Sequence, residues 1–253
     1  MHQRYQDTNA ETISRWVEEG WEWGTCIDHA TYLRALEGDW QVQLTPTKPV
    51  PRPWLGDLRG RRVLGLACGG GQQGPIFAAA GAKVTIVDLA PAMLEQERIV
   101  AAREGYPIDI LRADMTEPLP FDDESFDLVF NPVSICYVRE VEPIWREVAR
   151  VLAPGGAFLT GFDTIVNFIV DDAEERIVWA HPFDPLADPE VRAFLEEEDA
   201  GMQFGHDLTE TLGSILRAGM VVEDLYEDTN GEGRLHDLRI PTYLAVRATK
   251  PLR

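Results

Sequence analysis

The residues best placed to do chemistry follow two neighbouring apolar segments of the chain. Glycines 69–71 come directly after the apolar run at 63–66, and a helical pattern begins just beyond them. A glycine turn between a strand and a helix lets the backbone approach a nucleotide, because a side chain there would collide with the ligand or need an unfavourable positive φ. Asp88 ends a second apolar run at 84–87, where a carboxylate can accept hydrogen bonds from both hydroxyls of a ribose. The spacing therefore predicts a site for a nucleotide-containing cofactor.

The glycine pattern by itself fits more than one class of protein. Gly69, Gly71 and Gly74 match the G-x-G-x-x-G spacing of dinucleotide-binding proteins, which predicts a nicotinamide-dependent oxidoreductase. The same glycines would also suit a tight turn that binds no ligand. The strand before the glycines, the helix after them and the position of Asp88 favour a nucleotide site over a simple turn.

Composition and charge narrow the classes of partner. The chain has 253 residues, of which 45% are hydrophobic, so it can bury a large core. Its net charge of −20 repels phosphate backbones and anionic lipids, so we expect no nucleic-acid and no membrane partner. Cys26, Cys68 and Cys136 have neither metal-ligand nor disulfide spacing, and the N-terminus lacks the apolar core of a signal peptide. Both features suggest a cytoplasmic protein, and no apolar stretch approaches the roughly 20 residues that span a bilayer.

The N-terminal part, residues 1–57, is expected to form a helical cap and a linker. Two helical patterns follow one another, the first capped by Thr8 or Asn9 and the second beginning near Asp28. A proline-rich stretch at 45–53 favours extended structure and suggests a linker into the main domain. Four tryptophans of this part either pack its helices against the main domain or form an aromatic wall over a substrate pocket: Trp16, Trp21, Trp23 and Trp40.

From residue 58 onward, apolar strand patterns alternate with helical patterns. Such alternation predicts a parallel sheet with helices on both faces and with ligand-binding loops at the carboxyl ends of the strands. The last two strands have no helical pattern between them, so we expect them to pair antiparallel at the sheet edge. The expected fold is α/β: a three-layer, doubly wound sheet of seven mostly parallel strands with an antiparallel last strand, N-terminal helices and an inserted lid segment. The expected strands are about 62–67, 83–88, 108–111, 126–130, 157–162, 221–226 and 243–248, and the helices between them about 73–80, 91–105, 141–152 and 207–218.

The segment 163–205 interrupts this alternation within the main domain, residues 58–253. It holds 12 acidic residues against two arginines. A segment inserted after a strand end would lie over the ligand crevice, so it is a candidate lid and specificity element. A solvated acidic excursion is the alternative. We interpret the paired acids at 171–172 and 174–175 as a solvated face, and we expect no metal ion.

Five short motifs follow one another in the main domain: Ala67-Cys68-Gly69-Gly70-Gly71, Asp88-Leu89, Arg112-Ala113-Asp114-Met115, Phe126 to Asn131, and Arg150 to Gly156. In this order, and with the final hairpin, they resemble the class I S-adenosylmethionine (SAM)-dependent methyltransferases. The resemblance covers residues 60–162 by motif and 206–248 by the order of elements. It implies SAM as the cofactor and S-adenosylhomocysteine (SAH) as its product.

The resemblance implies a role for individual residues around the nucleoside. Asp88 would bind the ribose hydroxyls, and Asp114 would accept a hydrogen bond from the adenine amino group. Leu89 and Met115 would supply apolar contacts to the adenine. The full set of expected cofactor-binding residues is Ala67, Gly69, Gly71, Gln72, Gln73, Asp88, Leu89, Asp114, Met115 and Asn131.

The amino-acid end of the expected cofactor site departs from the family pattern. The family usually has an acid at the position of Gly65, which helps to hold the amino group of SAM, and a glycine at the position of Ala67. Gln72 and Gln73 follow the glycines and could supply polar contacts instead. The stretch resembles a bacterial branch of the family that has this Gly-Gly-Gly-Gln-Gln form.

Three residues are candidates for the acceptor side of the site. Asn131 and Tyr137 follow the fourth strand, beside the expected position of the methyl group, and Asn131 is thus expected on both sides. His206 lies where the insertion meets the next helix, so it could act as a base or contact the ligand. The structural alternatives are a strand-end turn residue for Asn131, a core aromatic for Tyr137 and a helix-cap or surface histidine for His206.

These features together predict a SAM-dependent methyltransferase that acts on a small molecule. The reaction would be an in-line displacement, in which the enzyme holds the acceptor near the methyl carbon and excludes water. A nicotinamide-dependent oxidoreductase and a non-catalytic SAM- or SAH-binding protein are the alternatives, and a protein acceptor is also compatible with an acidic lid. The sequence leaves the acceptor, the methylated atom and the oligomeric state open.

Overall fold

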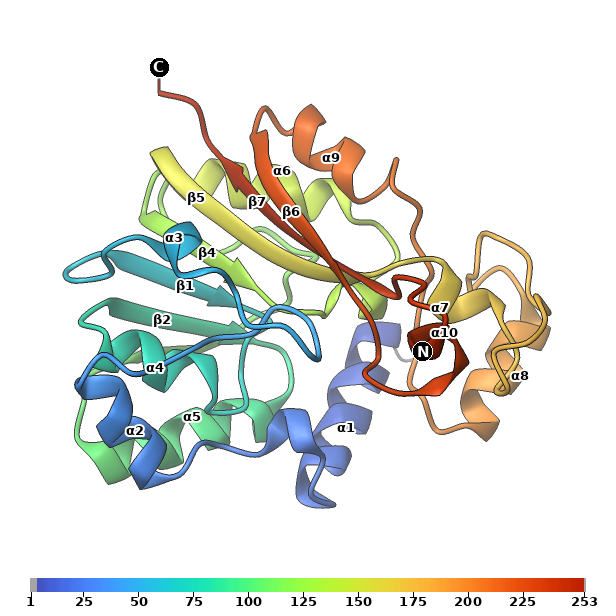
Figure 1. The fold of residues 1–253 in the computed structure, drawn as a ribbon, viewed down its shortest axis with the longest axis horizontal. Helices are drawn as coiled ribbons and strands as arrows, with labels where there is room; N and C mark the ends of the chain where they lie inside the picture. The colour runs from blue at the N-terminus through green and yellow to red at the C-terminus, as the bar shows by residue number, and fades with distance from the viewer. Residues whose placement is uncertain (1–3, 253) are drawn as a thin grey trace.

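The computed structural model describes residues 4–252 and shows a seven-stranded sheet with helices on both faces (Figure 1). The strand order is β3-β2-β1-β4-β5-β7-β6. β7 runs antiparallel to β5 and β6, and the other neighbours are parallel, so the predicted fold class is confirmed. The strands are β1 Arg62–Leu66, β2 Lys83–Asp88, β3 Asp109–Arg112, β4 Phe126–Asn131, β5 Leu152–Asp163, β6 Val221–Asp228 and β7 Tyr243–Thr249.

The sheet separates two apolar cores, as β1 illustrates. Val63 packs on one face in a cluster with residues of α4 and α5, whereas Leu64 and Leu66 pack on the other face with residues of α6 and α9. Successive side chains of a strand point to opposite faces, so a strand covered on both sides is apolar throughout. The covering helices are α4 Gln73–Ala79, α5 Pro91–Glu104, α6 Glu142–Val151 and α9 Leu212–Arg217.

The first helix lies at the carboxyl edge of the sheet. Figure 1 shows α1 (Tyr5–Glu18) beyond the arrowheads of β1 and β2, and a short 3-10 helix, η1 (Glu22–Gly24), follows it. The expectation that Thr8 or Asn9 caps this helix is wrong, because the helix begins at Tyr5. Asn9 is buried inside it and exchanges hydrogen bonds with the backbone of Met202.

The second helix begins where the sequence predicts. In α2 (His29–Leu36) the Asp28 side chain accepts a hydrogen bond from the Thr31 N–H at 2.7 Å and so caps the helix. In the proline-rich stretch 45–53 beyond it, Thr45 and Val50 are buried, whereas Thr47, Lys48 and Pro49 are exposed, and Val50 belongs to the core cluster of β1 and β2. The short α3 (Arg52–Leu55) continues this packing.

The end of the chain differs in detail from the prediction. A short helix, α10 (Gly233–Asp237), separates β6 from β7, although we expected no helix there. A helix of five residues is too short to show the apolar periodicity by which a sequence predicts a helix. The antiparallel pairing is nevertheless confirmed. Residues 208–211 form turns, so α9 is shorter than the expected 207–218.

The segment 163–205 forms two short helices, α7 (Val166–Ile169) and α8 (Pro189–Glu197). It has a small apolar cluster of its own, in which Phe168, Phe183 and Leu195 pack with Cys136 of the loop after β4. The segment is therefore anchored to the edge of the sheet and is not wholly solvated. Across residues 4–252, no helix has the length and apolar character that a bilayer crossing requires.

Candidate functional site

Two adjoining cavities lie at the carboxyl edge of the sheet. The first, of about 100 Å³, is lined by Asp88 at the end of β2, and we call it the Asp88 cavity. The second, of about 240 Å³, is lined by Asp163 at the end of β5, and we call it the Asp163 cavity. Both cavities are lined by Trp21, Ala67, Met93, Val133 and Tyr137. A ligand that lies across the Ala67 turn can therefore contact both.

The turn after β1 has a left-handed backbone at three positions. Ala67 has φ 46°, Gly70 has φ 100° and Gly71 has φ 68°. A glycine at position 70 is also needed for space, because a Cβ there would lie 2.6 Å from the carbonyl oxygen of Trp23. The Ile27 N–H donates to the Gly71 carbonyl at 3.0 Å. The segment around η1 therefore covers the glycine turn directly.

Asp88 lies at the junction of this turn and the Asp88 cavity. Its carboxylate accepts hydrogen bonds from the N–H groups of Gly69 and Ala90, each at 3.0 Å. Burial raises the pKa of Asp88, and these backbone donors partly offset that rise. Each carboxylate oxygen can accept more than one hydrogen bond, so the held carboxylate keeps capacity for ligand hydroxyls.

The expected adenine contacts line the same cavity. Leu89 and Met115 supply apolar surface, and Asp114 supplies a carboxylate. The Asp114 side chain also accepts hydrogen bonds from Thr116 and forms an ion pair of 2.6 Å with Arg4. The ion pair joins the start of α1 to the loop after β3, so it closes this end of the cavity.

The two glutamines after the glycines line the Asp163 cavity but also bind the N-terminal part of the chain. The Gln72 amide donates to the carbonyls of Glu22 and Thr25 at 2.8 and 2.9 Å. The Gln73 Oε1 accepts from the Gln43 N–H at 3.2 Å. Both glutamines thus hold covering segments in place and present amide groups to the cavity.

Packing explains the absence of an acid at the position of Gly65. A Cβ at Gly65 would lie 2.5 Å from Ile86 Cδ1 and 3.1 Å from Cys68 Cβ. The Cys68 side chain is itself buried and lines the Asp163 cavity. A side chain at position 65 would therefore need the buried Ile86 and Cys68 side chains to shift.

A buried glutamate beneath the glycine turn was not expected from the sequence. Glu97 of α5 is 0% exposed, and its Oε1 accepts a hydrogen bond from the Gly71 N–H at 2.9 Å. Burial, reinforced by the nearby Asp88 charge, raises the pKa of Glu97 to about 8. The close approach also requires glycine at position 74, where a Cβ would lie 2.6 Å from Glu97 Oε2. Gly71 and Gly74 thus allow Glu97 to pack directly against the glycine turn. The helical pattern of residues 91–105 did not indicate this contact.

Asn131 lines neither of the two cavities, because its side chain ties strand ends together. Its amide nitrogen donates to the Leu66 carbonyl and to Ser134 Oγ, both at 2.8 Å. Its amide oxygen accepts from the Thr160 hydroxyl at 2.9 Å. The side chain is fully buried. The structure therefore places Asn131 as a link between β1, β4 and β5, in keeping with the structural alternative.

Tyr137 lies where we expected, since it lines both cavities. Burial and the nearby Cys136 and Asp163 raise its pKa well above the usual value. Trp21 and Trp23 line the Asp163 cavity beside it, which supports the aromatic-wall interpretation for these two tryptophans. Trp40 instead packs against the core and under the Arg52 guanidinium.

The structure does not bring His206 to either cavity. Its imidazole is buried, and Nε2 lies 3.1 Å from the Ile135 carbonyl and 2.9 Å from the Val138 carbonyl. Because carbonyl oxygens only accept hydrogen bonds, Nε2 carries the proton. His206 therefore binds the backbone of the loop after β4, which contains Tyr137.

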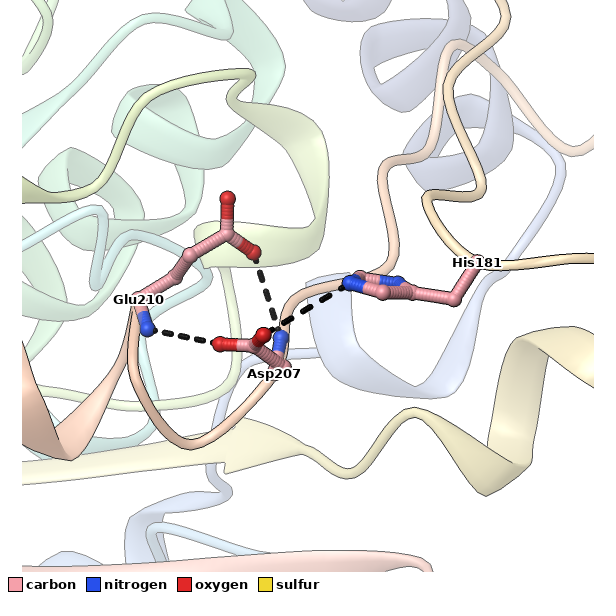
Figure 2. A group of neighbouring side chains, drawn as sticks. All are labelled: His181, Asp207 and Glu210. Atoms are coloured by element: carbon pink, nitrogen blue, oxygen red, sulfur yellow. Dashed lines mark hydrogen bonds and ion pairs between the residues drawn. The ribbon is translucent and has the colours of Figure 1, made fainter.

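His181, Asp207 and Glu210 form a small cluster next to His206 (Figure 2). The ring nitrogen of His181 lies 3.7 Å from the Asp207 carboxylate. Figure 2 also shows that Asp207 and Glu210 each accept a hydrogen bond from the other's backbone N–H. This reciprocal pattern is a capping box, so the two acids are explained by the turn that leads into α9.

Asp163 is a second residue, besides Glu97, that was not expected at the site from the sequence. It is the last residue of β5, as Asp88 is the last residue of β2, and this shared position was the available signal. Its Oδ1 accepts from the Asn167 amide at 2.8 Å, and its Oδ2 is buried. Burial raises the pKa of Asp163 to about 6. At the other end of the 163–205 segment, Gln203 lines the same cavity.

Comparisons with known proteins agree with this architecture. Residues 64–160 match the sequence profile of a methyltransferase domain. The chain is 37% identical over 250 residues to an uncharacterized methyltransferase, YbaJ, of Bacillus subtilis, covering 96% of this chain and 97% of that protein. A SAM-dependent methyltransferase from Mesorhizobium loti has a similar fold, with a TM-score of 0.61, 24% identity and coverage of 78% of this chain and 94% of that one. A geranyl diphosphate methyltransferase also has a similar fold, with a TM-score of 0.62 and 17% identity. This match covers 97% of our chain and 99% of the geranyl diphosphate methyltransferase chain.

The chain belongs to the class I SAM-dependent methyltransferases. It is therefore an enzyme of the transferase class with SAM as its cofactor. This assignment replaces the alternative of a nicotinamide-dependent oxidoreductase, which the glycine spacing alone had left open. The antiparallel β7 between β5 and β6 agrees with the assignment.

Proposed function

We propose that this enzyme methylates a small molecule bound in the Asp163 cavity, with SAM extending from the Asp88 cavity across the Ala67 turn. The observation that carries the proposal is the junction of the two cavities at Ala67, Val133 and Tyr137. A cofactor and an acceptor in separate cavities would meet there. The N-terminal segment covers the glycine turn, which favours a small acceptor over a protein chain.

The residues of the Asp88 cavity fit the nucleoside part of SAM by their chemistry. In the proposal, Asp88 accepts hydrogen bonds from the ribose hydroxyls, and Asp114 accepts one from the adenine amino group. Leu89 and Met115 contact the adenine through apolar surface. These contacts use oxygen atoms and apolar groups that line the cavity.

The methionine part of SAM would lie along Ala67 and Gly69, with the amides of Gln72 and Gln73 as polar contacts. These amides stand in for the acid that has no space at Gly65. Gly71 takes no direct part in this proposal, because its N–H donates to Glu97. The expected roles of Asn131 as a cofactor contact and of His206 as a base gain no support from their positions.

When bound, SAM supplies an electrophilic methyl group on a sulfonium. The chain has to hold the acceptor in line with that group and keep water away. Trp21, Met93, Val133 and Tyr137 surround the junction and supply apolar and aromatic surface for this purpose. Tyr137 also borders both cavities, so it can orient an acceptor through its hydroxyl.

The cavity chemistry favours a neutral or cationic acceptor over an anionic one. One solved structure of similar fold is described as a complex with geranyl diphosphate, GPP. Among the described residues that line the Asp163 cavity there is no lysine, arginine or histidine to bind a diphosphate. The three free thiols suit a reducing compartment, and we place the activity in the cytoplasm.

Isothermal titration with SAH tests the cofactor site, with NADH as the control ligand. We expect micromolar binding of SAH and no binding of NADH. Absence of SAH binding would contradict the proposed site and leave the methyltransferase fold without a working cofactor pocket. SAH binding without methyl transfer to any acceptor would instead support the non-catalytic SAM-binding alternative.

A further inference from the structure

Asp163 has a carboxylate that Asn167 holds at Oδ1, and the Cys136 thiol is the other side-chain donor beside it. Oδ1 accepts from Asn167 at 2.8 Å. Oδ2 is buried, and no hydrogen bond of standard geometry reaches it from the described residues. Within residues 4–252, no cationic group lies within 4.0 Å of this carboxylate. A buried carboxylate without a partner is costly unless a proton or a cation compensates it.

The groups around Asp163 come from separate parts of the chain. Tyr243 lies opposite Asp163 in the β5–β7 register. Burial opposes the charged form of the Asp163 carboxylate, whereas Asn167, the Cys136 thiol and, at longer range, His206 favour it. Burial raises the pKa values of Tyr137 and Tyr243, and the charge of the ionised Asp163 adds to this rise. The carboxylate is thus surrounded by neutral donors and has no fixed counter-ion.

The rest of the cavity is suited to a positive charge. Trp21, Trp23, Tyr137 and Tyr243 line it, and aromatic faces attract ammonium groups. The remaining polar lining consists of amide, hydroxyl and thiol groups, which carry no positive charge at neutral pH. Asp163 is the only carboxylate among the described lining residues. An anionic ligand would meet this carboxylate without any compensating cation.

We propose that the Asp163 cavity binds a compact protonated amine, and that Asp163 both holds the ammonium group and accepts its proton. This inference rests on the proposed methyltransferase function and names its acceptor class. Transfer of one proton from the ammonium to Asp163 leaves a lone pair on the neutral amine. That lone pair forms the new N–C bond while the C–S bond of the sulfonium breaks and its electron pair stays on sulfur. Atoms and charge balance without a further reactant.

The test measures binding of matched small probes to the SAH complex of the full chain. Benzylammonium, benzyl alcohol and benzoate share a ring and differ in charge, and butylammonium, butanol and butyrate repeat the comparison without the ring. Isothermal titration gives the affinity of each probe. We expect at least one ammonium probe to bind at least tenfold more tightly than its alcohol, and neither carboxylate to bind measurably.

Two variants assign the effect to Asp163. Asp163→Asn keeps the shape of the side chain and should weaken ammonium binding at least tenfold, while SAH affinity stays within about twofold. Asp172→Asn, an exposed acid of the same segment, should change neither affinity. Unchanged SAH binding in Asp163→Asn also shows that the variant is folded.

The outcomes separate this proposal from the proposed function. Failure of SAH to bind the parent protein would contradict the methyltransferase site itself. Binding of SAH with no binding of either ammonium probe would overturn the amine proposal alone. Tight carboxylate binding, or equal ammonium binding by Asp163→Asn and the parent, would also overturn it.

Discussion

Three acidic or amide side chains at strand ends have different roles, although each was a plausible site residue by position. Asp88 keeps hydrogen-bonding capacity toward a cavity after binding two backbone N–H groups. Asn131 uses its whole amide inside the protein. Asp163 lines the second cavity, and no cationic group among the described residues lies within 4.0 Å of its carboxylate. At the residue scale, the internal contacts of each side chain are the reason why we propose Asp88 and Asp163, and not Asn131, as ligand-binding residues.

Asp88→Ala should weaken SAH binding strongly. Each charge-assisted hydrogen bond to a ribose hydroxyl contributes about 1.5–3 kcal/mol, or roughly tenfold to a hundredfold in affinity. Isothermal titration measures the loss. Asp109→Asn, an exposed substitution on β3, is the control and should bind SAH as the parent does. Parent-like affinity in Asp88→Ala would show that the ribose is bound elsewhere.

Asn131→Ala should lower the free energy of unfolding more than it affects any ligand. The change leaves the Leu66 carbonyl and the Thr160 hydroxyl without their buried partner, at a cost of about 1–3 kcal/mol for each. Urea denaturation measures this loss. A variant of parental stability that no longer supports methyl transfer would restore the catalytic role that the sequence suggested.

Elements meet at the glycine turn from three directions. β1 leads into the turn, α5 supports it from below through Glu97, and the segment around η1 covers it through Trp23 and Ile27. Glycine is needed at positions 70 and 71, because α5 and the segment around η1 lie too close to the turn to leave space for a Cβ atom. At this scale the turn is a packing junction as well as a binding loop.

Glu97→Gln should make the free energy of unfolding less sensitive to a rise in pH from 6 to 8. Burial raises the pKa of Glu97 from its ordinary 4.5 to about 8, so the folded state favours the protonated form. The stability that this preference contributes is full below about pH 4.5 and is lost as the pH rises toward 8. Between pH 6 and 8 the parent should lose up to about 1.4 kcal/mol per pH unit through this group, and the neutral glutamine should lose none.

Urea denaturation at pH 6 and pH 8 measures that difference. Glu95→Gln changes an exposed neighbour on the same helix and should behave as the parent does. An equal fall in stability for the parent and Glu97→Gln would show that Glu97 does not titrate in this range.

The whole molecule closes its site with its own N-terminal part. Gln6, Asn9 and Ile13 of α1 line the Asp88 cavity, and Trp21 borders both cavities. Arg4, which precedes α1, forms an ion pair with Asp114, a residue that lines the same cavity. These contacts link distant parts of the chain, so a ligand in the Asp88 cavity would be enclosed between the sheet edge and α1.

SAH binding should therefore slow backbone hydrogen exchange in α1 and η1. The bound ligand would add contacts on the cavity side of these elements and reduce their local opening. Hydrogen exchange followed by mass spectrometry measures deuterium uptake with and without SAH. Peptides from α9, on the far core of the sheet, serve as the internal control and should not change. Unchanged uptake in α1 and η1 would mean that the N-terminal part does not enclose the cofactor.

The sequence alone determined the sheet, its antiparallel end and the family, because these depend on local apolar periodicity and on motifs in a fixed order. It also identified Ala67, Asp88, Leu89, Asp114 and Met115 as neighbours, since carboxyl ends of parallel strands share one edge. Only the tertiary structure separated Asn131 and His206 from the cavities and brought Asp163 and Glu97 into view. The physical reason is that burial and hydrogen-bond partners come from distant segments, such as Thr160 for Asn131 and Tyr243 for Asp163. The residues close in sequence do not show which distant residues a side chain will contact. Whether a polar side chain at a strand end faces a cavity or binds other parts of the protein therefore depends on tertiary packing.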